Sequence, residues 1–294
     1  MKSNATAEAP RSPRKMPRIA EGERIDFPRR FSRRLGGCIF FILSALLAAG
    51  CATKPIYTSQ PNLAIVVPGI GGDGDVYARI VCSLHDRGSS DCLRVSDWGS
   101  SLPIFFISIS SQSWHKNVER HLADQILEWR SGHPNSRIAL IAHSAGAGVV
   151  AGAVAQLPGG VRVGPIIFLA PALSPGFDLR PMLRHATIIH VFFSTDDFFW
   201  QGIGPTIFGN YDRVHSSGAG RVGFTLAVLN PSEKARVIQH PYQRCWKALD
   251  NDGGHYDWMA GPFVGAVLKP LIDARPPAAS IAAGTGRSSS ASSN

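Results

Sequence analysis

One serine in this chain has the surroundings of an exposed nucleophile. Ser144 follows an apolar run, residues 138–142, and precedes small residues that lead into a helical stretch, residues 149–156. A strand, a sharp turn and a helix in that order place the serine at the apex of the turn. A serine hydroxyl attacks a carbonyl carbon only when a base takes its proton and an acid orients that base. The chemistry therefore requires an acid and a histidine that the fold brings to this turn.

The elements that would position such residues alternate along the chain. Runs of strand length, most of them continuously apolar, cover residues 63–67, 92–97, 138–142, 163–172 and 187–193. Helical stretches cover residues 76–87, 118–129, 149–156 and 262–272. Continuous apolar runs are typical of strands buried on both faces of a parallel sheet. Strands that alternate with helices predict an α/β fold with helices on both faces of the sheet.

The turn around the serine carries a family resemblance. The sequence A-H-S-A-G at residues 142–146 resembles the nucleophile elbow of the α/β-hydrolase superfamily, in the A-H-S-x-G form of some bacterial lipases, with alanine at the first glycine position. The resemblance covers most of residues 62–273. It implies an α/β-hydrolase fold, a mostly parallel sheet with helices on both faces, over residues 62–275.

The resemblance also assigns oxyanion donors. The loop after the first strand begins Pro68-Gly69-Ile70, where the family has His-Gly-x, so the backbone N–H of Ile70 is expected to be one donor. The N–H of Ala145, directly after the nucleophile, is the other. The glycines of this loop also match G-x-G-x-x-G, but no acidic residue clearly ends the next strand, so a dinucleotide site is disfavoured. The serine mechanism requires no metal or organic cofactor.

In this superfamily the chain order is serine, acid, histidine. Two aspartates, Asp196 and Asp197, follow the apolar run that ends at Phe193. The acid usually lies three residues after the small residue that closes the strand. Ser194 in that place favours Asp197 and leaves Asp196 as the alternative.

Three of the ten histidines follow these aspartates. His255 has two glycines before it and the predicted last helix after it, which favours it as the base. His240 precedes a proline in a polar stretch and is expected on the surface. His215 lies in the aromatic, glycine-rich segment 198–224, which we expect to be a lid or pocket wall. His143, the variable residue of the elbow, is expected to point away from the serine hydroxyl.

The N-terminus predicts export and lipid attachment. Arginines at residues 29–34 precede the apolar run 35–50, and small residues then precede Cys51. Charge, a short apolar core and small residues before a cut are typical of a signal peptide. Sixteen apolar residues are fewer than the about 20 that a membrane span needs. The small residues before Cys51 resemble a bacterial lipobox, which implies a signal peptide over residues 1–50 and a lipid on Cys51.

The charge of the chain does not indicate nucleic acid. The net charge is +9, but residues 1–50 hold 10 Lys and Arg against 4 Asp and Glu. The remainder is therefore only weakly basic, whereas nucleic-acid binding requires a basic surface on the folded domain. Residues 51–61 are expected to form a polar tether, and residues 276–294, rich in Pro, Ala, Ser and Gly, are expected to be disordered.

Three cysteines remain beyond Cys51, and none has zinc-site spacing. Cys82 and Cys92 flank a predicted helix-to-strand turn and are the expected pair if a disulfide forms, with Cys245 free. Three unpaired thiols are the alternative.

These features together predict an exported serine hydrolase of the bacterial envelope, anchored by its lipid at the outer membrane or the periplasmic face. Carboxylic esters, of small molecules or lipids, are the expected substrates; thioesters, amides and acyl transfer stay open. The competing hypothesis is a catalytically silent hydrolase fold that serves in binding or envelope structure. Nothing in the sequence indicates an oligomeric state.

Overall fold

The computed structural model describes residues 61–70, 72, 74–89, 91–98, 111–197 and 210–274. The chain divides into two units, Met1–Gly50 and Cys51–Asn294, and all described residues belong to the second. The predicted signal peptide, Cys51, most of the tether, residues 198–209 of the expected lid and the tail 276–294 lie outside the described residues. Those predictions stay predictions.

The described strands form one six-stranded sheet in the order β2-β1-β3-β4-β5-β6, and every pairing is parallel. The strands are β1 (Asn62–Val67), β2 (Asp91–Val95), β3 (Ile138–His143), β4 (Ile166–Leu169), β5 (Ile189–Phe193) and β6 (Val237–Pro241). The predicted α/β class is confirmed, and the described sheet is wholly rather than mostly parallel.

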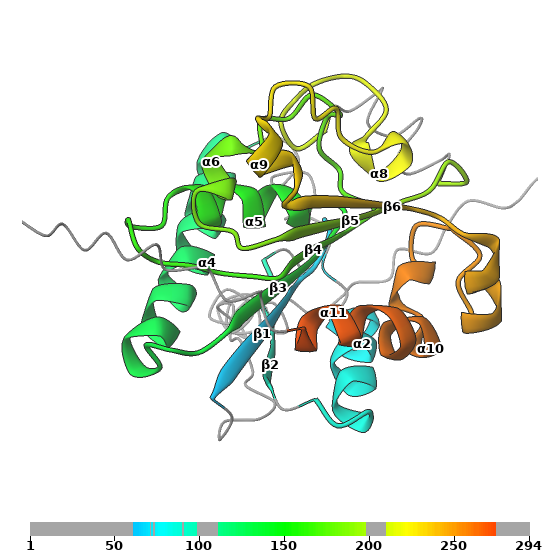
Figure 1. Ribbon diagram of the computed structural model, residues 1–294, viewed down its shortest axis with the longest axis horizontal. Coiled ribbons are helices and arrows are strands. Elements are labelled where there is room, and N and C mark those ends of the chain that lie inside the picture. Colours follow the sequence, from blue (N-terminus) through cyan, green and yellow to red (C-terminus); the bar gives the residue numbers. More distant parts are fainter. Residues whose placement is uncertain are drawn as a thin grey trace, which may run out of the picture. The chain divides into compact units, whose positions relative to one another are not determined.

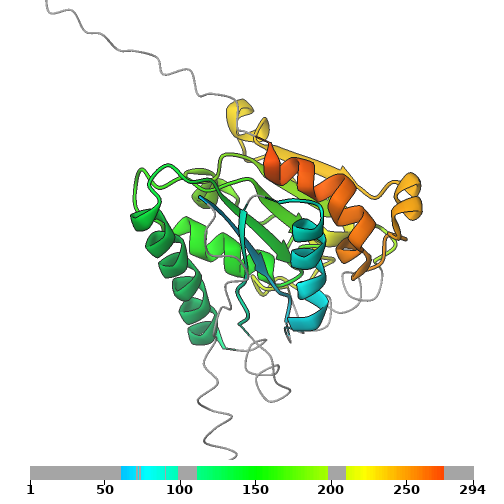
Figure 2. The ribbon, with the colours of Figure 1, turned by 90° about the horizontal axis from the view of Figure 1, so that it is seen from below.

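Helices cover both faces of this sheet (Figure 1). One face carries α4 (Gln112–Gly132), α5 (Gly146–Ala155) and α6 (Arg180–Leu183). The other carries α2 (Gly74–Asp86) and the final helix, which consists of α10 (Gly261–Phe263), the π turn η4 (Val264–Leu268) and α11 (Lys269–Asp273). Figure 2 shows α2 and the final helix side by side on that face. Short helices complete the described fold: α8 (Ala219–Val222), α9 (Pro231–Lys234), η2 (Arg244–Leu249) and η3 (Asp257–Met259).

Strand β1 shows why the predicted strands are continuously apolar. Leu63, Ile65 and Val67 belong to the core beneath α4 and α5. Ala64 and Val66, which alternate with them, belong to the core beneath α2 and the final helix. Side chains of a strand point alternately to the two faces, so a sheet that is covered on both faces needs apolar residues at every position.

Strand β6 was not predicted. It lies at the edge of the described sheet, paired only with β5, and only Val237 of its residues is buried. An edge strand is shielded less than a central one, so the sequence V-I-Q-H-P shows no apolar run. His240, which was expected in a surface stretch, lies in this edge strand and is partly buried.

The predicted helices are found, with two changes. Helix α4 extends beyond the predicted residues 118–129 at both ends, and it begins at Gln112 because Ser111 caps it by accepting a hydrogen bond from the N–H of Trp114 at 3.3 Å. Helix α2 begins two residues before the predicted residue 76, and its buried face includes Tyr77. The final helix, predicted over residues 262–272, is confirmed.

Cys82 and Cys92, the expected pair if a disulfide forms, are not joined, and the structure has the alternative of three unpaired thiols. Both are free thiols, and so is Cys245. Cys92 lies in β2 with its side chain in the core beneath α4 and α5. Cys82 is an exposed residue of α2, which packs on the opposite face. The sheet therefore separates two residues that are neighbours in the sequence.

Candidate active site

The elbow has the backbone of a strained turn. Ser144 follows β3 directly, lies just before α5, and has a φ of 53°. A positive φ is rare for a residue that carries a Cβ and marks sites where the surroundings hold the backbone under strain. A Cβ built at Gly146 would overlap the carbonyl oxygens of Val67 and Pro68, so the elbow packs directly against the end of β1.

The glycine loop after β1 meets the elbow. A Cβ built at Gly69 would lie 3.0 Å from the Cβ of Ser144. Strands β1 and β3 are neighbours, whereas the chain goes from β1 to β2 on the other side. In parallel sheets, ligand sites lie at such a reversal, at the carboxyl ends of the strands. The predicted oxyanion residues Ile70 and Ala145 thus stand on the two loops that flank this point.

The two aspartates after β5 differ in their surroundings. The hydroxyl of Ser194 accepts the N–H of Asp196 at 3.1 Å, and its carbonyl accepts the N–H of Asp197 at 3.2 Å. This turn leaves Asp196 exposed and buries Asp197. The position three residues after the small residue is therefore the one that faces the interior.

Asp197 and His255 are in direct contact. The Nδ1 of His255 lies 2.6 Å from the Oδ2 of Asp197, and both side chains are almost wholly buried. A carboxylate oxygen accepts, so Nδ1 carries the proton of this bond. In the neutral ring Nε2 then keeps a lone pair. The pair thus holds the histidine in the tautomer that can take a proton from a hydroxyl.

The loop that carries His255 is built around glycine. Gly253 has a φ of +86°, and a Cβ there would lie 2.8 Å from the hydroxyl oxygen of Ser194. The side chain of Asn251 accepts the N–H of Gly253, and that of Asp257 accepts the N–H of Gly254, each at 2.9 Å. Glycine therefore lets the histidine loop pack directly against the turn that carries the acid.

The other two candidate histidines lie elsewhere. His215 is exposed. The Nε2 of His240 lies 3.0 Å from the Nδ1 of His190, on neighbouring strands β6 and β5. Burial, and then the proximity of His240, lower the pKa of His190 to about 4. Neither candidate contacts Asp197 through a hydrogen bond that the described residues show, so His255 is the histidine that the fold brings to the acid.

The described part of the expected lid, residues 210–224, is packed against the domain near the elbow. The N–H of Tyr211 donates to the carbonyl of Ala172 at 2.9 Å, and the N–H of Ala172 donates to the carbonyl of Ser144 at 3.0 Å. The Tyr211 hydroxyl donates to Glu119 of α4 at 2.8 Å. Burial raises the pKa of Glu119. This end of the segment therefore lies one residue away from the serine backbone.

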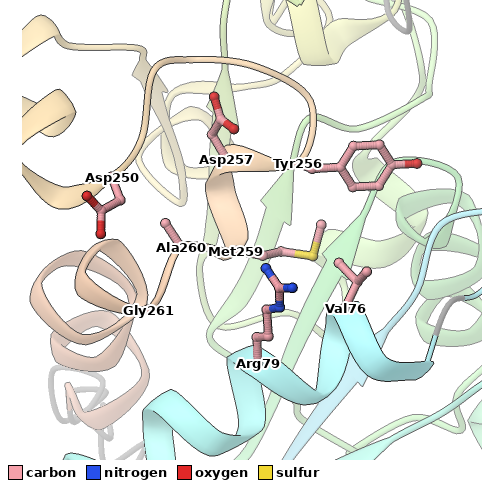
Figure 3. A pocket seen from close by; sticks show the side chains of 8 residues that line it. All are labelled: Val76, Arg79, Asp250, Tyr256, Asp257, Met259, Ala260 and Gly261. Atoms are coloured by element: carbon pink, nitrogen blue, oxygen red, sulfur yellow. The ribbon is translucent and has the colours of Figure 1, made fainter.

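A pocket of about 580 Å³ borders the histidine loop (Figure 3). Its lining consists of Val76, Arg79, Asp250, Tyr256, Asp257, Met259, Ala260 and Gly261. The ring of Tyr256 joins it to the site, because it lies 5.2 Å from the ring of His255. Figure 3 shows Arg79 and Val76 of α2 facing Met259 across the pocket. The lining does not include Ser144, so the pocket alone does not define where a substrate binds.

The described residues contain no group of three or more His, Cys, Asp or Glu that could hold a metal ion. In the same part of the chain, no helix has the length and apolarity needed to cross a membrane.

Three residues of this region were missed by sequence reasoning. Tyr77 accepts the N–H of Gly69 at 2.9 Å, and Trp98 donates to the carbonyl of Pro68 at 2.7 Å. His143 was expected only to point away from the serine, yet it is hydrogen-bonded through both ring nitrogens. A tyrosine on the buried face of the helix after a glycine loop is the one signal that could have indicated the first contact.

No protein-family model and no curated protein matches the chain. Among solved structures it is similar to esterase PE8, with 12% identity, 74% of this chain and 97% of that chain covered, and a TM-score of 0.43. A dienelactone hydrolase from Anabaena variabilis has 12% identity, coverage of 74% and 87%, and a TM-score of 0.42. The ydeN gene product from B. subtilis has 16% identity, coverage of 72% and 100%, and a TM-score of 0.41.

The strand order, the elbow after β3, the acid turn after β5 and the histidine loop after β6 carry the fold assignment by themselves. They are the arrangement that the sequence predicts, an α/β-hydrolase fold.

Proposed function

We propose that this protein is a serine hydrolase that cleaves carboxylic esters, with Ser144 as nucleophile, His255 as base and Asp197 as the acid that orients it. The observation that carries the proposal is the buried contact of 2.6 Å between His255 and Asp197, made at the same sheet edge as a serine with a φ of 53°. When its ring is neutral, a histidine whose Nδ1 donates to a carboxylate has the lone pair of Nε2 for accepting a proton, as a general base requires.

The reaction has two halves. His255 takes the hydroxyl proton of Ser144 through Nε2 while the serine oxygen attacks the ester carbonyl, and then gives that proton to the departing alcohol. Water attacks the carbonyl of the resulting acyl-enzyme while the same histidine takes its proton; the bond to the serine oxygen then breaks, the histidine returns the proton to that oxygen, and the carboxylic acid leaves. The backbone N–H groups of Ile70 and Ala145 stabilise the oxyanion in both halves, typically by about 3–4 kcal/mol for each donor.

A fluorophosphonate probe tests the nucleophile. We expect wild-type protein to be labelled covalently at Ser144, with labelling abolished in Ser144→Ala and strongly slowed in His255→Ala. Ser174→Ala is the matched control, since its hydroxyl bonds the Asp212 side chain rather than the histidine. An unlabelled but folded wild type favours the silent fold instead.

Hydrolysis and acyl transfer are separated by the fate of the acyl group. With a short-chain p-nitrophenyl ester we expect free acid as the main product in water. Transfer to an added alcohol as the main product would make the protein an acyltransferase with the same acyl-enzyme. A panel of chain lengths then gives the preferred ester.

Export and lipid attachment form a separate part of the proposal, supported by the sequence before Cys51. We expect the mature form to carry its lipid on Cys51 and to sediment with membranes. The Cys51→Ser variant should keep its signal peptide uncleaved or be released as a soluble protein. Retention of acylation in that variant would contradict the assignment, without bearing on the hydrolase.

A further inference from the structure

Two loops of the candidate site are joined by a third residue, His143. Its side chain is buried between the glycine loop after β1 and the loop that carries His255. Its Nδ1 lies 2.8 Å from the hydroxyl oxygen of Tyr77, and its Nε2 lies 2.8 Å from the backbone carbonyl oxygen of His255. The rings of His143 and His255 are 4.5 Å apart.

The proton positions in these contacts are determined by the partners. A carbonyl oxygen only accepts, so Nε2 of His143 carries a proton. Burial, and then the proximity of His255, hold the pKa of His143 well below its usual value, so the ring is neutral. Nδ1 therefore has a lone pair and accepts the hydroxyl proton of Tyr77. The Tyr77 oxygen in turn accepts the N–H of Gly69 at 2.9 Å.

The peptide units before the proposed oxyanion donor, the N–H of Ile70, are also hydrogen-bonded. The peptide between Pro68 and Gly69 is held at both ends, since Tyr77 accepts its N–H and Trp98 donates to its carbonyl at 2.7 Å. The carbonyl of Gly69 accepts the N–H of Gly72 at 3.3 Å. In a trans peptide the N–H points opposite to the carbonyl, so the N–H of Ile70 is directed away from the Gly72 side of the loop.

We propose that Tyr77 and His143 are positioning residues of this active site: one continuous hydrogen-bonded path, from Gly69 through Tyr77 and His143 to the His255 backbone, holds the oxyanion loop and the base at fixed places around Ser144. The inference rests on the proposed hydrolase function. Its physical basis is that misplacing a catalytic group by about 1 Å can cost on the order of 10²-fold in rate.

Tyr77→Phe is the direct test, because it removes one oxygen and keeps the ring that packs in the core. It leaves the N–H of Gly69 and the Nδ1 of His143 without their partner. With a p-nitrophenyl ester, we expect kcat to fall about tenfold or more and KM to change less than twofold, since the donor acts in the transition state. The loss should stay below the ~10²–10³-fold of deleting an oxyanion donor outright.

Ile80→Val is the matched control. Ile80 lies on the same helix, three positions on, and is buried in the same core without a polar group. The melting temperature of Ile80→Val should fall by about as much as that of Tyr77→Phe, while its kcat, its KM and its rate of fluorophosphonate labelling stay within twofold of wild type. An equal loss of kcat in both variants would reduce Tyr77 to a structural role and overturn the inference.

Two substitutions of His143 test its contacts with Tyr77 and with the His255 carbonyl separately. His143→Gln can place an amide nitrogen near the position of Nε2 and keep the donor to His255, whereas His143→Asn is too short and keeps only an acceptor near Tyr77. We expect Gln to retain more of kcat than Asn at unchanged KM. The reverse order would contradict the link to the base.

Nitrogen-15 NMR of the wild-type imidazoles gives a readout that requires no turnover. We expect His143 as the Nε2–H tautomer and His255 as the Nδ1–H tautomer; an Nδ1–H His143 would overturn the inference. If the probe labels the wild type and Tyr77→Phe is fully active, the positioning role is refuted but the proposed hydrolase function is not. A folded wild type with no labelling and no turnover refutes the proposed function and, with it, this inference.

Discussion

Two buried aspartates at opposite ends of the sheet show what a carboxylate can be used for. Asp91 begins β2, and both of its oxygens accept hydrogen bonds from Arg137, at 2.6 and 2.7 Å. Asp197 follows β5 and contacts His255 at 2.6 Å. The geometry is alike, but arginine does not release a proton at any physiological pH and histidine does. The first pair therefore joins strands, and the second can transfer a proton.

The backbone conformation around the two pairs also differs. Arg137 directly precedes β3, and among the described residues at the amino ends of the strands only glycine has a positive φ. At the other end, Ser144 and Ala170 have positive φ angles, and glycines let the loops approach one another closely. Backbone strain at Ser144 and Ala170, which carry a Cβ, indicates that function is concentrated at the carboxyl ends of the strands.

The largest expected effect removes the nucleophile. Ser144→Ala should lower kcat for ester hydrolysis roughly 10⁶-fold, and Ser144→Ala with His255→Ala little further, because the members of a triad act as a unit. Steady-state kinetics with thermal melts as a folding control measure this. Full activity of Ser144→Ala against any ester that the wild type cleaves would contradict the assignment of Ser144 as the nucleophile.

Removing the charge from each aspartate comes next and tests the comparison directly. Asp197→Asn should lower kcat about 10⁴-fold at little cost in stability, because the histidine is no longer held in the right tautomer. Asp91→Asn should leave kcat within a few-fold in the folded protein. Similar kinetic losses in both variants would mean that the two pairs do not differ in role.

The structural pair should matter for stability instead. Arg137→Met leaves the Asp91 carboxylate buried without its cation, which should cost about 3–5 kcal/mol of unfolding free energy at pH 7. Burial already raises the pKa of Asp91 above 3.8, more than Arg137 lowers it. A raised pKa means that folding favours the protonated form, so this group's contribution to stability decreases as pH rises above 3.8.

Without Arg137 that pKa rises further, and the loss in Arg137→Met should therefore be smaller at pH 4.5 than at pH 7. Urea denaturation at the two pH values measures the difference. An Arg137→Met penalty that does not depend on pH would show that Asp91 is not the origin of the loss.

The smallest effect is expected at the neighbouring aspartate. Asp196→Asn should keep kcat and KM within twofold, because the Asp196 side chain is exposed and Asp197 makes the contact with His255. The same kinetic assay serves here. A loss comparable to that of Asp197→Asn would place the acid at Asp196.

The sequence predicted those parts of the molecule that have a periodic apolar pattern or a local motif. Strands β1 to β5 appear as runs of strand length because most are covered on both faces, and the final helix appears through its apolar content. The acid and the histidine were placed by their order and by the small residues beside them. Strand β6 has no apolar run in the sequence, because an edge strand needs few buried residues.

Contacts between distant residues could not be predicted in the same way. His143 and Tyr77 are 66 positions apart, and only the packing of α2 against the loop after β1 brings them together. The conditional pairing of Cys82 with Cys92 fails for the same reason, since closeness in sequence says nothing about the face of the sheet on which a side chain lies. Which aspartate turns inward depended on how Ser194 closes the turn.

The close approach of Gly146 to the end of β1 affects how chains of this type can vary. The motif is usually written with two equivalent glycines, but here the first is Ala142, which is fully buried within β3, while a Cβ at the second would overlap the backbone of Val67 and Pro68. A saturation library should accept small side chains at the first position and only glycine at the second. Sequence searches that relax the first glycine and keep the second should therefore find distant relatives that a symmetric pattern overlooks.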